Sequence, residues 1–209
     1  MEIYFVRHGE SKANLLNETS TPDTPLSEKG IQDAINAGKL LNGKFDRVFV
    51  SPYLRARQTQ RYAMDGADAE VVDYIHELFL GTAEGFFYPD LYEKYPLFRY
   101  HCEVDDFSDY DGETYDDIRN RVRRFKEFLQ TLDADRVVVF THAGFIWTFF
   151  DEIMQRKDKS GRNIRCDNGS VSVFFFENGN PPIVLQGRST IAPAVSFEIV
   201  CRFPDYSAE

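Results

Sequence analysis

Short apolar runs alternate along this chain with segments of helical periodicity, and this alternation restricts the possible folds more than any other feature. The run at 136–140 (RVVVF) is uninterrupted, as in a strand that is covered on both faces. Runs of this kind predict strands at 2–6, 47–50, 136–140, 171–176 and 183–185. A turn signal at 178–181 separates the last two. Strands that alternate with helices indicate an α/β fold with a mostly parallel sheet.

The intervening segments carry helix signals. Ser27 is a suitable N-cap for a helix that ends near Gly43. Ser51-Pro52 suits a strand-to-helix turn with the proline early in a helix that continues over 53–64. The clearest apolar stripe predicts a helix over 113–132, and another apolar segment predicts one from Phe145 onward. With 209 residues, we expect a single domain with a sizeable core.

The formal net charge of −10 argues against partners that need a positive field, so we expect binding neither to nucleic acid nor to an anionic membrane. A locally positive pocket for a small anion remains compatible with this charge. Cys102, Cys166 and Cys201 are widely spaced and odd in number, which favours free thiols over disulfides or a zinc site. The apolar run at 3–6 is too short for a signal peptide, and the expectation is a cytoplasmic protein.

Residues 86–110 depart from the strand–helix rhythm. They contain nine aromatic and six acidic residues but only Lys94 and Arg99 as basic residues. Such a composition predicts either a lid insertion or a satellite hydrophobic cluster under a long loop. Both interpretations stay open from the sequence.

Polar residues that carry chemistry follow the predicted strands. His8 comes after the first strand, Arg55 shortly after the second, and His142 after 136–140. If these strands are parallel neighbours, both histidines and Arg7 and Arg55 meet at one sheet edge, where α/β proteins bind ligands. Guanidinium groups match phosphate oxygens, and a neutral imidazole flanked by positive charge can attack phosphorus. The glycine after His8 would allow a close backbone approach to a ligand. Each residue alone is more often structural, and the joint placement favours function.

Seven segments in order resemble the histidine phosphatase superfamily, the phosphoglycerate-mutase-like proteins. They are RHGES with Asn14, PLSEKGIQDA, SPYLRARQT, HELFLGTAEG, GETYDDIRNRV, VVVFTHAGFI and DNGSVSVFF. The resemblance covers about residues 1–185, is closest to the phosphatase branch, and implies a three-layer α/β sandwich with a mostly parallel central sheet. The segment 196–203 could be one more strand without an assigned role.

The resemblance also implies roles. His8 would become phosphohistidine, while Arg7, Arg55 and His142 would bind the phosphoryl group with help from Asn14 and the backbone of Ala143. Glu77 would be the general acid and later the base, with Glu84 as a rival that is more similar to a structural glutamate of the family. No metal or cofactor is implied, because cationic side chains would neutralise the phosphoryl group.

Two departures from the family pattern are Ala83, where tryptophan is frequent and a more open pocket wall is therefore expected, and Tyr53, where leucine is common.

The implied reaction is hydrolysis of a small phosphomonoester. A phosphoglycerate mutase is the alternative, disfavoured because residues 86–110 are acidic and would repel a doubly phosphorylated ligand. A non-catalytic phosphate-binding module is the other alternative. The aromatic residues favour a substrate whose non-phosphate part is planar, apolar or neutral. The oligomeric state, monomer or homodimer, stays open.

Overall fold

The computed structural model describes residues 1–156, 159–163, 165–175 and 183–187. The predicted turn at 178–181, the segment 196–203 and Cys201 lie outside these ranges. The described strands are β1 (Glu2–Arg7), β2 (Arg47–Val50), β3 (Glu70–Val71), β4 (Arg136–Thr141), β5 (Val171–Phe175) and β6 (Ile183–Gly187). The described α-helices are α1 (Lys12–Leu16), α2 (Glu28–Leu40), α3 (Leu54–Ala63), α4 (Tyr88–Lys94), α5 (Phe98–Val104), α6 (Tyr115–Gln130) and α7 (Ala143–Ile153).

The strands form one sheet in the order β3-β2-β4-β1-β5-β6. The pairs β3–β2, β2–β4 and β4–β1 are parallel, and β5 is antiparallel to both of its neighbours. The predicted mostly parallel sheet is therefore confirmed. Arg7 pairs with Thr141, and Val50 pairs with Phe140, so β1, β2 and β4 end at the same edge.

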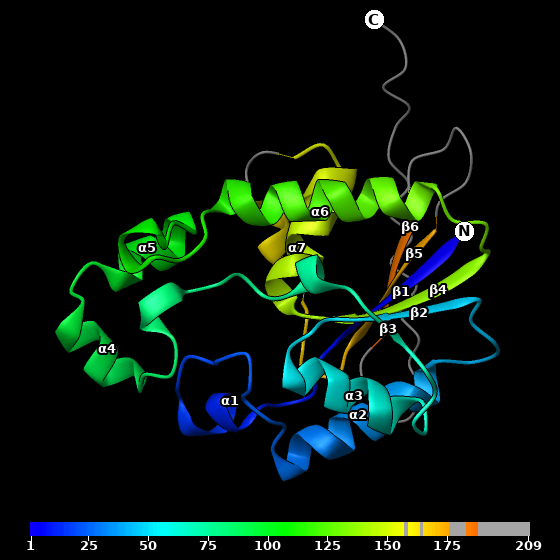
Figure 1. The fold of residues 1–209 in the computed structure, drawn as a ribbon, viewed down its shortest axis with the longest axis horizontal. Coiled ribbons are helices and arrows are strands. Elements are labelled where there is room, and N and C mark those ends of the chain that lie inside the picture. The colour runs from blue at the N-terminus through cyan, green and yellow to red at the C-terminus, as the bar shows by residue number, and fades with distance from the viewer. Residues whose placement is uncertain (157–158, 164, 176–182, 188–209) are drawn as a thin grey trace, which may run out of the picture.

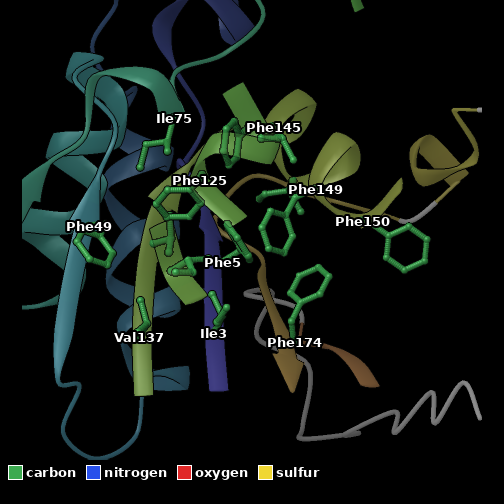
Figure 2. Close-up of a cluster of buried hydrophobic side chains, with 14 of the residues drawn as sticks. Ile3, Phe5, Phe49, Ile75, Phe125, Val137, Phe145, Phe149, Phe150 and Phe174 are labelled. Atoms are coloured by element: carbon green, nitrogen blue, oxygen red, sulfur yellow. The ribbon is translucent and has the colours of Figure 1, made fainter. Parts of the chain in front are cut away.

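Helices cover both faces of the sheet, with α6 and α7 on one side and α2 and α3 on the other (Figure 1). The strands alternate accordingly. Ile3, Phe5 and Val139 pack with α6 and α7, in the aromatic-rich cluster that Figure 2 shows around Phe5, Phe125, Phe149 and Phe174. Val6, Val138 and Phe140 pack instead with Ala37 of α2 and Ala56 of α3. The implied three-layer sandwich is thus present.

Local signals explain most helix boundaries. The Ser27 hydroxyl accepts the N–H of Gly30 and caps α2, as expected. Thr114 and Asp117 form a capping box at the start of α6, which therefore begins at Tyr115 rather than at Glu113. Two other predicted starts were also wrong. Pro52 precedes the N-cap Tyr53 and lies outside α3, and α7 begins at Ala143 rather than at Phe145, because His142 is its N-cap.

Residues 86–110, hereafter the 86–110 segment, contain α4, α5 and a short 3-10 helix, Ser108–Tyr110. They lie to one side of the sandwich, beyond the N-terminal end of α6 (Figure 1). Leu91, Phe98, Phe107 and Tyr110 are buried there with Ala83 in a hydrophobic cluster separate from the two sheet cores. Ala83 is fully buried in that cluster, and the more open pocket wall expected at this position stays a prediction. Across the described parts of the chain, no helix has the length and apolarity needed to cross a membrane.

Candidate active site

The ends of three neighbouring strands bring the predicted residues together. His8 follows β1, and its N–H donates to the carbonyl of Thr141 at the end of β4 (3.0 Å). His142 follows β4, and the two imidazole centroids lie 5.2 Å apart. Ser51 follows β2 and contacts His142 from the other side, with 2.8 Å between its Oγ and His142 Nε2. The expected convergence of the two histidines at one sheet edge is therefore present.

The hydrogen bonds of His8 define its tautomer. Its Nδ1 lies 2.7 Å from the carbonyl oxygen of Gly9, which can only accept, so Nδ1 carries the proton. Its Nε2 accepts from Nε of Arg55 at 3.2 Å. Burial, followed by the charges of Arg55 and Arg7, holds the pKa of His8 well below its usual range. His8 is therefore a neutral, buried imidazole whose Nε2 lone pair faces a guanidinium group.

His142 has the opposite arrangement. The Ser51 hydroxyl accepts the N–H of Tyr53 (3.3 Å), which leaves its own proton for His142 Nε2. Burial, followed by the positive charge of Arg55, keeps the pKa of His142 well below its usual range. A neutral ring that accepts at Nε2 carries its proton on Nδ1. In the described part of the chain, that buried Nδ1 has no hydrogen-bond partner, and neither has Nε of Arg7.

The two arginines lie beside these rings. Arg55 is almost fully buried, and its Nη1 donates to the carbonyl of Thr21 (2.9 Å). Arg7 Nη1 donates to the carbonyl of Cys166 at 2.5 Å. Both guanidinium groups are thus oriented by backbone carbonyls, which accept hydrogen bonds without neutralising the charge.

Within the described ranges, no group of three or more His, Cys, Asp or Glu side chains is arranged to hold a metal ion.

Asn14 and Ala143 lie at helix starts. Asn14 belongs to a capping box, in which its Oδ1 accepts from the N–H and hydroxyl of Ser11 (3.1 and 2.9 Å). Its amide NH₂ group is thus the part able to donate to an anion. Ala143 is the first residue of α7, where the free N–H groups and the helix dipole favour negative charge.

Glu77 meets this edge from the loop before the 86–110 segment. Its Oε1 accepts the N–H of Leu78 (3.0 Å), and its Oε2 accepts the N–H of Gly144 (3.4 Å). A Cβ on Gly144 would come within 2.3 Å of Glu77 Oε1, so a side chain there would displace the Glu77 carboxylate. The rival Glu84 is half-buried, and burial raises its pKa to about 7.

Arg121 of α6 holds the Glu77 loop in place. It pairs with Glu113 (2.7 Å), and its Nη1 donates to the carbonyls of Tyr74 and His76 (2.8 and 3.0 Å). Glu113 in turn accepts the N–H of Phe79 (3.0 Å). The segment GETYDDIRNRV signals this pair in the sequence, although our sequence analysis gave these residues no role.

Tyr53 links several site residues that the sequence analysis did not connect. Its ring stacks on His76 (centroids 5.4 Å apart) and meets His142 edge-on (5.2 Å). The Arg55 guanidinium lies 5.0 Å from the ring centroid of Tyr53.

Gly9 also differs from expectation. A Cβ there would lie 2.1 Å from the carbonyl oxygen of Gly30, so this glycine permits close packing against α2 rather than approach to a ligand.

A cavity of about 300 Å³ begins beside Glu77 and Gly144. It lies between α7, the start of α6 and the 86–110 segment, and residues 159 and 162 border it as well. None of these lining residues beyond Glu77 was a predicted site residue. The signal that could have indicated them is the aromatic composition of the 86–110 segment.

Comparisons with known proteins show which proteins this chain is similar to. Residues 3–188 match the sequence profile described as histidine phosphatase superfamily (branch 1). The chain is 28% identical over 201 residues to the adenosylcobalamin/alpha-ribazole phosphatase of Salmonella typhimurium, a match that covers 92% of this chain and all of that protein. The crystal structure of the alpha-ribazole phosphatase from Shigella flexneri superposes with a TM-score of 0.75 at 26% identity, over 85% of this chain and 91% of that one.

A shorter match joins residues of this chain to the 2,3-bisphosphoglycerate-dependent phosphoglycerate mutase 2 of Latilactobacillus sakei. It is 42% identical over 71 residues but covers only 32% of this chain and 31% of that protein.

Proposed function

The chain belongs to the histidine phosphatase superfamily, branch 1, and we propose that it hydrolyses a small phosphomonoester through a phosphohistidine at His8. The two relatives described above that match most of its length are among several that do so, and both are named as phosphatases, which supports hydrolysis. We further propose that the reaction requires no metal ion, because Arg7, Arg55 and the N–H of His142 supply the positive potential that phosphoryl transfer needs.

In the first step, Nε2 of His8 attacks phosphorus in line with the leaving oxygen. The N–H groups of Arg55 turn to phosphoryl oxygens as the ester binds, which releases the lone pair of His8. The P–O bond breaks, and Glu77 gives its proton to the departing alkoxide. In the second step, the Glu77 carboxylate takes a proton from water, the oxygen of that water attacks phosphorus, and the P–N bond breaks. Phosphate leaves, and both His8 and Glu77 return to their starting protonation states.

The observation that carries this proposal is the pair of unpartnered donors beside His8. Nδ1 of His142 and Nε of Arg7 are both buried without a hydrogen-bond partner among the described residues. An unpaired buried donor costs about 1–3 kcal/mol. Phosphoryl oxygens would satisfy both donors at once and bring phosphorus within reach of the neighbouring His8.

The alternative functions receive less support. In the 86–110 segment, Lys94 lies 4.3 Å from the ring centroid of Phe86, and Arg99 lies 4.3 Å from that of Tyr92. Both cations thus contact aromatic rings of the segment itself. A mutase would instead need such cations to hold a second phosphoryl group. The match to a mutase covers under a third of the chain. A binding module without turnover has no need of a neutral His8.

The test is hydrolysis by the whole chain with a chelator present. Phosphate release is measured against a panel of phosphomonoesters, and the phosphoenzyme is trapped by rapid acid-free denaturation and detected by mass spectrometry. We expect release and a single phosphoryl adduct on residue 8, both lost in His8→Ala. His101→Ala is the matched control, since this buried histidine bonds the carbonyl of Asp106 in the 86–110 segment. Full activity in His8→Ala would refute the mechanism, and phosphoryl transfer to a sugar rather than to water would restore the mutase.

A further inference from the structure

The cavity beside Glu77 lies where the departing part of a substrate must go. In-line attack by His8 places the leaving oxygen on the far side of phosphorus. If Glu77 protonates that oxygen, the rest of the alcohol extends past Glu77, and the cavity begins at Glu77 and Gly144. We propose that this cavity binds the alcohol part of the substrate, and that this part is a planar, uncharged aromatic ring system such as that of a nucleoside. This inference rests on the proposed phosphatase function.

The walls of the cavity favour a flat ring. Five aromatic side chains line it, and Leu78, Leu80 and Ile118 add aliphatic surface; the aromatic residues are Tyr88, Phe98, Phe107, Tyr115 and Trp147. Aromatic faces bind planar groups by offset or edge contacts. Its volume of about 300 Å³ is at the lower end for small-molecule sites, which suits one ring system.

The charged groups of the cavity oppose a second anion. Its lining contains the carboxyl groups of Glu77, Asp105 and Asp151 against the cations of Lys159 and Arg162. Both cations pair with the same buried carboxylate, Asp105. The lining therefore contributes no cation without an acidic partner, and a second phosphate or carboxylate on the substrate would find no unpaired positive charge there.

Asp105 and Asp151 are themselves occupied. Asp151 accepts the N–H of Gly161 (2.7 Å) and the hydroxyl of Tyr115 (3.4 Å). Because these carboxylates already accept protein hydrogen bonds or pair with cations, a positively charged ring gains little from them. The chemistry that remains is stacking and apolar contact with an uncharged ring.

The test compares esters that share one phosphorylated pentose. Ribose 5-phosphate, adenosine 5′-monophosphate and adenosine 3′,5′-bisphosphate differ only in the ring and in a second anion. We expect kcat/KM for the nucleoside monophosphate to exceed that for ribose 5-phosphate by at least about tenfold, and the bisphosphate to lose most of this gain. Tyr88→Ala removes one half-buried wall, and its ratio of the first two values should fall toward one. Tyr100→Ala is the matched control, because Tyr100 is 58% exposed and is not among the residues that line the cavity.

The outcomes separate the two levels of the argument. Equal or better hydrolysis of ribose 5-phosphate, an unchanged ratio in Tyr88→Ala, or an equal fall in Tyr100→Ala overturns the cavity assignment, while phosphate release and the adduct on residue 8 leave the phosphatase intact. Turnover confined to open-chain esters overturns it too. Absence of both phosphate release and the adduct with every ester overturns the phosphatase, and the cavity assignment with it.

Discussion

Replacement of Ser51 by alanine tests whether the hydroxyl of Ser51 sets the tautomer of His142. The hydroxyl accepts from the N–H of Tyr53 and lies 2.8 Å from His142 Nε2, so that Nδ1 carries the proton toward the phosphoryl site. Without the hydroxyl, Nε2 loses its donor, and the ring is free to carry its proton there. Nδ1 would then present a lone pair to a phosphoryl oxygen. The hydrogen bond from His142 to that oxygen would be replaced by repulsion between two lone pairs.

The expected loss follows from the number of donors involved. One preorganised donor to a developing negative charge is worth about 10²–10³ in kcat, so Ser51→Ala should lose about that much. Stability should fall by about 1–3 kcal/mol, because the N–H of Tyr53 and Nε2 of His142 are left buried without their partner. KM should change little if the donor acts mainly in the transition state.

The assay combines steady-state kinetics with ¹⁵N NMR of the imidazole nitrogens, which reports the protonated nitrogen directly. Ser172→Ala is the matched control, since Ser172 is equally buried and its hydroxyl has no hydrogen-bond partner among the described residues. Ser51→Thr keeps the hydroxyl and should recover part of kcat. The reasoning is refuted if folded Ser51→Ala keeps kcat within about threefold of the parent, or if wild-type His142 carries its proton on Nε2.

Three further predictions concern the acid, its glycine contact and the pH dependence. Glu77→Gln should lower kcat about 10²–10³-fold for alkyl esters and far less for aryl esters with acidic leaving groups, and Glu84→Gln should not show this dependence on the leaving group. The reverse pattern would assign the acid to Glu84, whose pKa is raised to about 7 by burial. Gly144→Ala should reduce kcat about tenfold or more by displacing the Glu77 carboxylate, and unchanged kinetics would contradict the 2.3 Å approach. Burial holds the pKa values of His8 and His142 far below the pKa of a histidine in the unfolded chain. As the pH falls, the unfolded state therefore takes up protons first. The free energy of unfolding should decrease below about pH 6.5, by up to about 1.4 kcal/mol per pH unit for each ring. Chemical denaturation at several pH values checks this, and a slope that His142→Gln leaves unaltered would argue against it.

The centre of the fold was predictable because its signals are local. Uninterrupted apolar runs at 2–6 and 136–140 belong to strands covered on both faces, and neighbouring parallel strands bring their ends to one edge. If these strands are parallel neighbours, as the structure shows for β1 and β4, His8 and His142 come together at that edge. The starts of α3 and α7 were harder, because Tyr53 and His142 act as N-caps without a side-chain hydrogen bond to the helix.

The rest of the site was hidden because it depends on contacts between distant segments. The 2.8 Å contact between Ser51 and His142 joins residues 91 positions apart, and Lys159 and Asp105 meet across 54 positions. Gly144 is in the sequence an ordinary helix residue, and only the approach of Glu77 shows that a side chain there would displace its carboxylate. No periodicity or capping rule encodes such pairs.

The two parts of the site are therefore built by different means. The phosphoryl centre comes from β1, β2 and β4, whose register fixes it to the sheet. The cavity comes from the 86–110 segment, the start of α6 and one side of α7, and the cluster of that segment is separate from the sheet cores. Glu77 is the one proposed catalytic group that lines both. Substitutions in the 86–110 segment should thus alter the choice of alcohol without altering attack on phosphorus, whereas a change at Glu77 or Gly144 should affect both at once.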